Sequence, residues 1–551
     1  MSSTLDGATE TATQTCGLEQ CDVCVVGTGA GGGILAHQLA MAGLRVISLE
    51  QGGALAADHF KTVMPPGLGR TFGVSPDTVW PSDPHNSLFI HPLFAKADQG
   101  STARTPGGFQ HFQVLAVNGL QNLWNGVSVR FSAKDLSSWP IKPDDLSRHY
   151  SAVEQLITVC GTRDGIDELP DGVFIEPKPF RPPDQLVIDA ITQLGEPYSH
   201  AIANRKAINT RVGTPNACVS TGVCTSGCPV GAVYKFSSRL LPEIQGLPNY
   251  QLITHAKVTK LIRAAHSQHI EAVHYLDTRT GEPHRITAKT FVLATGAIET
   301  PRILLNSADA IDPDGIGNHH GLVGQGLQDN PKVVLSTSLR KLWGKRRDYD
   351  IGYGDLLILM SRGKLPNGSD FPFIGHAIHG IADYPHYLSQ MQLLPAALKE
   401  FAARKLFHSY MTLGLFSEGI RTPENRVRLA DTNDRYGVRQ VTVDFTIPEQ
   451  SQRQMDAMMR WGRRVLKGAS GTFIYTTRDN SGTGIHYAGT TPLAGNPKEG
   501  VVDANLKVYG YDNLYVCDGG VIPKLPDKHL TLTIMALAHR LGDHLGQRSG
   551  R

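Results

Sequence analysis

Three glycines near the start of the chain have the spacing of a nucleotide-binding turn. Gly27, Gly29 and Gly32 form a G-x-G-x-x-G motif directly after a short apolar run at 23–26. In such a motif the first glycine permits a tight turn, the second lets a diphosphate approach the backbone, and the third lets helix and strand pack closely. Glu50, which ends the next apolar run, is placed to accept a hydrogen bond from a ribose 2′-hydroxyl. The pattern predicts a dinucleotide site, for either NAD or FAD.

The elements expected around this motif make it specific. A lone G-x-G-x-x-G is weak evidence in a chain with 58 glycines among 551 residues. This one lies between two apolar runs, 23–26 and 44–49, and the N–H groups at the start of the helix expected between them would bind the diphosphate. A further buried strand at 290–295, followed by a helix at 299–305, is expected to return the chain to the same sheet. Val258, on another predicted strand, would then lie near the adenine.

Composition restricts the class of protein. The length predicts two or more domains, and 40% hydrophobic with 19% charged residues is typical of a globular protein. The net charge of +3, with acids and bases interspersed, gives no indication of a nucleic acid or an anionic membrane as partner. No apolar run has the length of a membrane span. Residues 1–20 are polar and lack the pattern of a signal peptide, so we expect a cytoplasmic protein.

The middle of the chain has the pattern of a second, substrate-facing domain. Strand-like pieces alternate with long helical stretches between 330 and 480, including helices expected at 388–406 and 449–468. Earlier in the chain we expect a helix capped by Asp144, and an irregular excursion over the nucleotide at 54–100. These segments predict a sheet backed by helices beside the nucleotide-binding part.

Four stretches together resemble the glucose–methanol–choline (GMC) family of FAD-dependent alcohol oxidoreductases over nearly the whole chain. They are VVGTGAGGGILA near the N-terminus, FVLATGAIETPRILLNS at 291–307, VGQGLQDNP at 323–331, and the tail from His486 to Leu545. The resemblance implies that the cofactor is FAD rather than NAD. It also implies an α/β chain (α+β overall), in which a doubly wound FAD-binding domain is paired with a substrate domain built on a mostly antiparallel sheet backed by helices.

The resemblance and the order of the motifs divide the chain into five segments. The FAD-binding domain is expected to be built from 21–150, 251–330 and 484–551. A substrate-side excursion with a cluster of cysteines is expected at 151–250, and the substrate domain at 331–483.

Two histidines of the tail fall where the family places its catalytic pair. His486 matches the first member, and His529 matches the second, which is His or Asn in different relatives. Oxidation of an alcohol requires removal of the hydroxyl proton as hydride leaves carbon. An imidazole, with an ordinary pKa of about 6.5, can accept that proton, and a second imidazole can orient the hydroxyl and stabilise a developing alkoxide.

Other residues are assigned to the flavin by the same resemblance. Asp518 and Gly519 match the family's turn near the pyrophosphate and the ribityl chain, and Asn125 and Gly126 match its flavin-facing loop. His529, besides its catalytic role, and the adjacent Leu530 are assigned to the cofactor with them. The loop around Asn125 lacks the usual Gly-Gly-Ser start of the family, and the context of His529 also departs from the commonest pattern.

Three cysteines follow a separate pattern, Cys218-x₅-Cys224-x₃-Cys228. It resembles the subgroup of sugar and gluconate dehydrogenases that carry a three-iron cluster, which three thiolates could hold. The alternative is that the cysteines only pack in a turn, as in related flavoenzymes without a cluster. The spacing suits zinc poorly, and no metal site is assigned.

These observations predict an FAD-dependent dehydrogenase or oxidase that acts on a CH–OH group of a sugar-like substrate. Relatives of this kind oxidise a primary hydroxyl of aminoglycoside or aminocyclitol intermediates to aldehyde or acid during antibiotic biosynthesis. One alternative is an oxidoreductase of steroids or other apolar alcohols, and another is a flavoprotein that serves as an electron-transfer or binding subunit. The sequence assigns neither the electron acceptor nor the oligomeric state.

Overall fold

The computed structural model describes residues 20–55, 102–379, 409–478 and 482–549, apart from 221, 223, 229, 346–349 and 351, with a few isolated positions between 395 and 406. The expected polar leader at 1–20, the excursion at 54–100 and the helix at 388–406 lie almost entirely outside these residues. Among the described helices, none combines the length and the apolar composition that crossing a bilayer requires.

A seven-stranded mixed sheet carries the glycine motif. Its strands follow the order β5-β2-β1-β8-β7-β6, with β16 also paired to β8. The strands β5, β2, β1, β8 and β16 run parallel, whereas β6, β7 and β8 form antiparallel pairs. Their bounds are β1 Gln20–Val26, β2 Val46–Leu49, β5 Tyr250–Ile253, β6 Ala256–Arg263, β7 Ile270–Asp277, β8 Pro283–Leu293 and β16 Leu514–Val516. Chain segments far apart in sequence therefore meet in one sheet, and the domain boundaries expected above stay a prediction.

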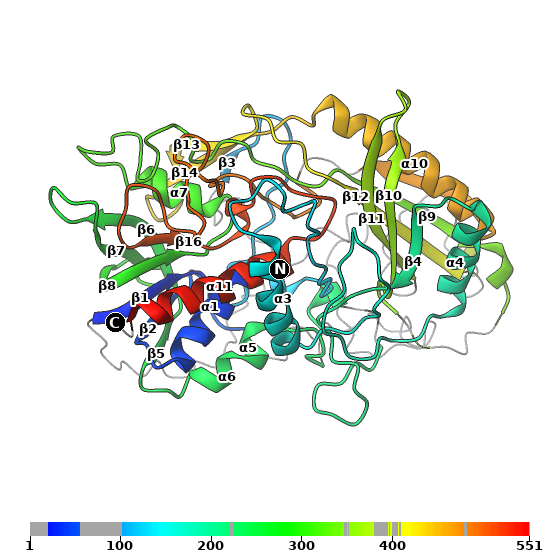
Figure 1. Cartoon of the computed structure of the whole chain (residues 1–551), viewed down its shortest axis with the longest axis horizontal. Coiled ribbons are helices and arrows are strands. Elements are labelled where there is room, and N and C mark those ends of the chain that lie inside the picture. The colour runs from blue at the N-terminus through cyan, green and yellow to red at the C-terminus, as the bar shows by residue number, and fades with distance from the viewer. Residues whose placement is uncertain are drawn as a thin grey trace.

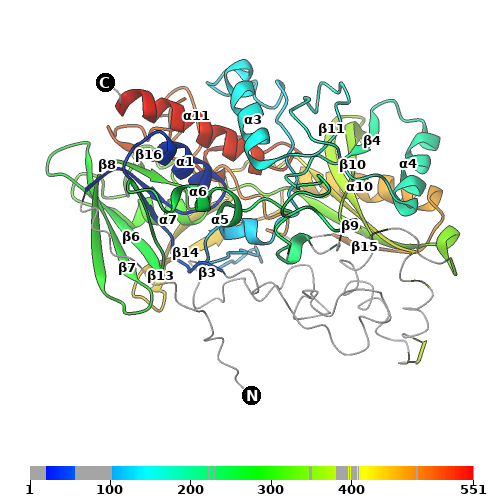
Figure 2. The same ribbon diagram turned by 90° about the horizontal axis from the view of Figure 1, so that it is seen from below.

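The first and the last helices pack together beside this sheet. Helix α1 (Ala30–Met41) and helix α11 (Thr531–Ser549) lie side by side, the blue and red helices of Figures 1 and 2. Helix α3 (Pro143–Ile157) packs on α11, and the Tyr150 hydroxyl lies 2.7 Å from that of Thr533. The expectation that Asp144 caps α3 is wrong: Lys142 is the N-cap residue and Pro143 begins the helix, because proline fits the first helical position.

A six-stranded antiparallel sheet forms the other half of the molecule, in the order β15-β9-β12-β11-β10-β4. Figure 1 shows it on the opposite side from the mixed sheet. Helices α10 (Glu449–Gly468) and α4 (Pro182–Leu194) cover one of its faces. The strands are β4 Ser199–Ala203, β9 Lys332–Leu339, β10 Leu356–Lys364, β11 Asp370–His379, β12 Tyr410–Ser417 and β15 Gly471–Arg478.

Two strands of the stretch 330–480, for which the sequence predicted a single sheet, belong instead to a third, smaller sheet. Strands β13 (Arg426–Asn433) and β14 (Arg439–Asp444) pair with each other, and β14 pairs with β3 (Thr102–Arg104). Strand propensity alone does not specify a partner, so the sequence could not separate the two sheets. The shorter helices are α5 Phe236–Arg239, α6 Leu241–Ile244 and α7 Glu299–Asn306, with 3₁₀ turns at Gly119–Asn122, Cys224–Ser226, Arg340–Leu342 and Gly519–Val521.

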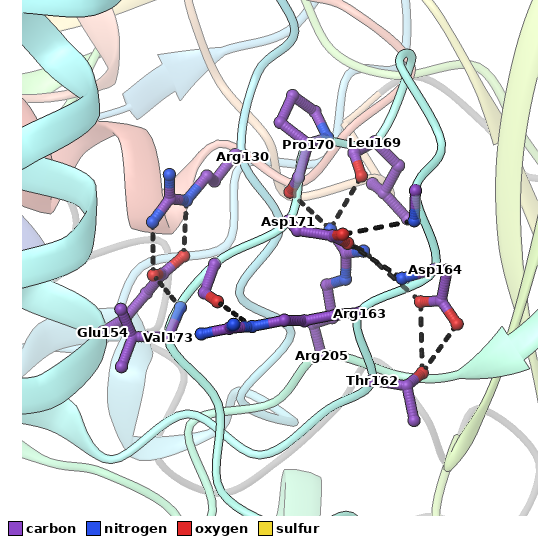
Figure 3. A network of polar contacts seen from close by, with 12 residues as sticks. Arg130, Glu154, Thr162, Arg163, Asp164, Leu169, Pro170, Asp171, Val173 and Arg205 are labelled. Carbon is purple, nitrogen blue, oxygen red and sulfur yellow. Dashed lines mark hydrogen bonds and ion pairs between the residues drawn. The ribbon is translucent and has the colours of Figure 1, made fainter.

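Two buried arginines fix the segment that connects α3 to the second half (Figure 3). Arg130 makes a bidentate ion pair with Glu154 of α3, at 2.7 and 2.6 Å, and the side chain of Glu154 is fully buried. Arg205 donates to Asp171 at 2.7 Å and to the carbonyl oxygens of Leu169 and Pro170. Buried charges are tolerated when paired and hydrogen-bonded in this way. Glu154 also accepts from the backbone N–H of Val173 at 2.8 Å, which holds the connection against α3.

Candidate active site

One cavity of about 430 Å³ is lined by residues from both the mixed sheet and the six-stranded sheet. Most of the residues expected to bind the cofactor or the substrate line it. These are Gly27, Gly29, Glu50, Asn125, Val258, Asp518, Gly519, His486, His529 and Leu530. The nucleotide turn and the two tail histidines therefore face the same cavity.

The glycine turn has the close packing that a diphosphate cradle requires. Gly27 has a φ of +95°, which favours glycine, and a Cβ at Gly32 would lie 1.9 Å from the carbonyl oxygen of Gly27. Gly32 does not line the cavity but lets the helix approach the strand. A Cβ at Gly29 would meet nothing closer than 4.0 Å, so this glycine leaves open space toward the cavity. Gly31, which the motif does not single out, packs against the carbonyl of Cys517 in the tail.

Glu50 and Thr28 form one hydrogen-bonded unit beside the turn. The Glu50 carboxylate accepts from the backbone N–H of Thr28 at 3.1 Å, from its hydroxyl at 2.6 Å, and from the backbone N–H of Gly52 at 3.1 Å. Burial raises the pKa of Glu50, and these donors oppose the shift. The carboxylate is thus held at the cavity wall, where the residues present fit the ribose end of FAD.

Asp518 connects the tail turn to the segment after β8 at the same wall. Its carboxylate accepts from the backbone N–H of Gly296 at 3.0 Å, from the Thr300 hydroxyl at 2.6 Å, and from the N–H of Gly520 at 2.8 Å. A Cβ at Gly519 would lie 2.4 Å from the carbonyl oxygen of Tyr487. The tail turn is therefore packed tightly against the end of β8.

The loop around Asn125 presents only part of itself to the cavity. Asn125 and Trp124 line it, and the Trp124 indole donates to the carbonyl of Tyr234 at 2.8 Å. Gly126 does not line the cavity. It has a φ of +81°, and its carbonyl accepts from the N–H of Ala207 at 2.7 Å. Gly126 therefore anchors the loop to Ala207, on the side away from the cavity.

The two tail imidazoles lie against each other. The ring centroids of His486 and His529 are 4.6 Å apart, at an interplanar angle of 71°. Both rings contact Phe416 of β12, with centroid distances of 5.7 and 5.2 Å. The Nδ1 atom of His529 is buried and has no hydrogen-bond partner in the part of the chain that the structure describes. This nitrogen can therefore form a hydrogen bond with a bound molecule.

Asn330 determines which nitrogen of His486 carries the hydrogen. Both amide hydrogens of Asn330 are used, because its Nδ2 donates to the carbonyl oxygens of Ser417 at 2.7 Å and Pro526 at 2.8 Å. Its Oδ1 must then be the acceptor toward Nδ1 of His486, 2.8 Å away. The hydrogen of the neutral imidazole is on Nδ1, so the lone pair is on Nε2.

Asp329 fixes the backbone that carries the same histidine. Its carboxylate accepts from the N–H groups of Gly484 and His486, each at 2.8 Å. Burial raises the pKa of Asp329 to about 6. Asp329 and Asn330 belong to the VGQGLQDNP stretch, which the sequence identified without indicating what either side chain contacts.

The surroundings keep the imidazoles neutral. Burial and the neighbouring His529 and Lys332 hold the pKa of His486 well below its usual value, and burial with Lys332 lowers the pKa of His529 to about 4. A neutral imidazole can accept a proton from a bound group.

Alternation along the six-stranded sheet brings further residues to the cavity, none of which sequence reasoning singled out. Lys332 of β9, His376 of β11, and Thr412, Gly414 and Phe416 of β12 line it. Residues one position away on these strands face the other side, where α10 packs. The alternation is visible in the sequence, but it does not tell which face meets the nucleotide-binding half.

The cysteine pattern lies at a separate cavity of about 30 Å³, lined by Cys218, Cys224, Cys228 and also Cys160. Burial raises the pKa of Cys160 and Cys224 to about 12. Over the described ranges, no three of these sulfur atoms lie within 4.8 Å of one another, so they do not form a site for a single metal ion. A cluster binds its thiolates at separate irons, and iron analysis of the purified protein distinguishes a cluster from packed thiols.

Comparison with known proteins agrees with this arrangement. Models of the GMC oxidoreductase family match residues 185–332 and 421–538. The chain is 28% identical over 540 residues to the 6′′′-hydroxyparomomycin C oxidase of Streptomyces lividus, covering 94% of this chain and 90% of that one. It is 26% identical over 562 residues to the 2-methyl-1,2-propanediol dehydrogenase of Mycolicibacterium austroafricanum, covering 96% of each.

The fold is shared with the solved structure of an oxidase. Pyridoxine 4-oxidase from Mesorbium loti superposes with a TM-score of 0.62 at 17% identity, covering 95% of this chain and 99% of that one. The matched region 185–332 contains strands β5 to β8 of the mixed sheet, and the matched region 421–538 contains His486 and His529. The chain therefore belongs to the GMC oxidoreductase family and is an FAD-dependent oxidoreductase that acts on alcohols.

Proposed function

We propose that this protein oxidises a CH–OH group of a sugar-like substrate, with His486 as the base and His529 as the residue that orients the alcohol. The lone pair of His486 Nε2 receives the hydroxyl proton as the C–O bond becomes a carbonyl. Bound FAD supplies the acceptor for the hydride that leaves carbon. The turn at Gly27 and Gly29, with Glu50 and Asp518, would hold that cofactor.

The observation that carries this proposal is the hydrogen bond between Asn330 and His486. It leaves Nε2 as the nitrogen with a lone pair, and burial keeps the ring uncharged before the reaction. His529, 4.6 Å away by ring centroids, can donate a hydrogen bond to the same hydroxyl oxygen. An alcohol bound between the two rings would then lose its proton to one ring while the other holds its oxygen.

The sugar-like class is supported by the polar groups on the substrate side of the cavity. Lys332, His376 and Thr412 line the sheet face there, which suits a hydroxylated molecule better than a sterol. The names of the two relatives give a hydroxyparomomycin and a propanediol as substrates of those enzymes. We therefore extend the class of hydroxylated substrates to this protein, including aminoglycoside intermediates of antibiotic biosynthesis.

Anaerobic flavin reduction tests the proposal. The purified yellow protein is mixed with sugars, aminoglycosides and sterols, and the loss of flavin absorbance is followed. We expect sugars or aminoglycosides to bleach the flavin and sterols to leave it oxidised. Reduction by sterols alone would contradict the sugar assignment, and a flavoprotein that no alcohol reduces would favour an electron-transfer or binding subunit.

A further inference from the structure

A third imidazole faces the cavity and takes no part in the proton transfer described above. His376 lies on β11, is 5% exposed, and lines the cavity together with His486 and His529. Its ring centroid is 5.8 Å from that of His529 and 5.8 Å from that of Phe416. His376 therefore adds an imidazole from the six-stranded sheet beside the two imidazoles of the tail.

The Nδ1 atom of His376 is buried without a hydrogen-bond partner among the residues that the structure describes. An unsatisfied buried polar group costs about 1–3 kcal/mol, and a histidine that serves only packing would be expected to find a partner in the protein. A neutral imidazole offers one donor and one acceptor. A hydroxyl group, which both donates and accepts, is the matching ligand.

The residue opposite His376 leaves room for such a group. Gly414 of β12 is the direct register partner of His376 and lines the same cavity. A Cβ built on Gly414 would lie 3.8 Å from Phe416 and 3.9 Å from Nε2 of His376, so the space adjoins the second nitrogen of the ring whose Nδ1 is unpartnered. The backbone at Gly414 does not have the positive φ that favours glycine. Neither close packing nor backbone conformation requires a glycine here, and its effect is open space beside the imidazole.

Charge at this wall favours a neutral ligand over a cationic one. Lys332 lines the cavity, and both Lys332 and Lys206 lie close enough to lower the pKa of His376, after the larger effects of burial and His529. Lys206 is itself paired with Asp355 at 3.1 Å. Asp355 compensates that charge, so an ammonium group placed beside His376 would be repelled chiefly by Lys332, whereas a hydroxyl would not.

We infer that His376 and the space beside Gly414 form a subsite for a second hydroxyl, carried on the carbon next to the one that is oxidised. The substrate class is then a vicinal diol within a polyol or a sugar ring. The inference rests on the proposed function, because it places the reacting hydroxyl between His486 and His529. Phe416, which contacts all three rings, would support the carbon skeleton between the two hydroxyls.

The test compares a diol with the matching mono-alcohol. Flavin reduction in the holoenzyme is measured anaerobically with cyclohexane-1,2-diol and with cyclohexanol. The proteins compared are the wild type, His376→Phe, His376→Gln and Gly414→Ala. We expect kcat/KM of the wild type to be about 10- to 100-fold higher for the diol, the range that corresponds to one unpaired buried group. His376→Phe should bring this ratio close to one, because it removes both ring nitrogens that could bind the second hydroxyl, which cyclohexanol lacks.

The other two variants control for structural effects. His376→Gln keeps a donor and an acceptor and should retain part of the preference for the diol. Gly414→Ala leaves His376 intact and fits without a clash, yet its methyl group occupies the space of the second hydroxyl, so it should also lower the ratio. A wild-type ratio near one, or equal losses for both alcohols in His376→Phe, would overturn this inference alone. Absence of reduction by every alcohol would overturn the proposed function and the inference with it.

Discussion

The side-chain oxygen of Asn330 lies 2.8 Å from Nδ1 of His486, and the amide that carries it is held in place by two backbone carbonyl groups. The orientation of this amide is therefore set by the fold rather than by the histidine. The contact selects one tautomer of His486 and directs the lone pair to Nε2. It links the stretch at 323–331 to the chemistry of the tail.

Replacing Asn330 with aspartate should change the pH dependence of the reaction. A carboxylate facing Nδ1 stabilises the imidazolium and raises the pKa of His486. Because the base must be neutral, activity should then be lost at a higher pH as the solution is acidified. The pH profile of anaerobic flavin reduction measures this shift. An acid limb of Asn330→Asp that coincides with that of the wild type would contradict the role given to Asn330.

The charge of Lys332 should also affect the acid limb of the pH profile of flavin reduction. The lysine lowers the pKa of His486, His529 and His376. Lys332→Met removes that repulsion, so the imidazoles should become protonated at a higher pH and the acid limb should move upward. Lys332→Arg keeps the charge and serves as the control. A shift of equal size in both variants would show that the charge is not responsible.

Gly29 should be needed for FAD binding but not for folding. A Cβ there meets nothing closer than 4.0 Å in the protein, although the cofactor's diphosphate is expected to approach this position. Gly29→Ala should leave the thermal stability of the apoprotein unchanged and weaken FAD affinity about 10-fold or more. Gly246→Ala, which also meets no atom within 4 Å and lies outside the cavity, should bind FAD normally. Unaltered affinity in Gly29→Ala would place the diphosphate elsewhere.

The ion pair between Arg130 and Glu154 should contribute to stability far more than an exposed pair. Arg130→Met leaves the fully buried carboxylate of Glu154 without its cation, which typically costs about 3–5 kcal/mol in the free energy of unfolding. Arg285→Met breaks the pair with Glu271, whose side chain is 50% exposed, and should cost less than about 1 kcal/mol. Denaturant unfolding of the holoenzyme compares the two variants. Equal losses in the free energy of unfolding would show that the burial of an ion pair does not determine its contribution to stability.

The sequence predicted local elements well where pattern and motif coincide. The strand, turn and helix at Gly27, and the long helix α10 at Glu449–Gly468, are as expected, and the tail histidines share the cavity with the glycine turn. The fold class and the FAD-dependent family are confirmed. The catalytic roles of His486 and His529 remain proposals.

Contacts between distant segments could not be predicted. Asn330 acquires its role from the carbonyl groups of Ser417 and Pro526, which lie 87 and 196 residues further along the chain. His376 and Gly414 become neighbours only through the register of β11 and β12. A one-residue shift of either strand against the other would turn that strand's residue away from the cavity, and no local pattern specifies the register.

The measurement that tests the central claim most directly is the rate of flavin reduction in His486→Ala under anaerobic conditions, with a sugar that reduces the wild type. The variant should purify yellow with its full complement of FAD, because Glu50 is held by Thr28 and Gly52 and the hydrogen bonds of His486 run to Asp329 and Asn330. Loss of the base should slow reduction by about 10²-fold or more. A yellow His486→Ala protein that is reduced as fast as the wild type would show that the proton is accepted elsewhere.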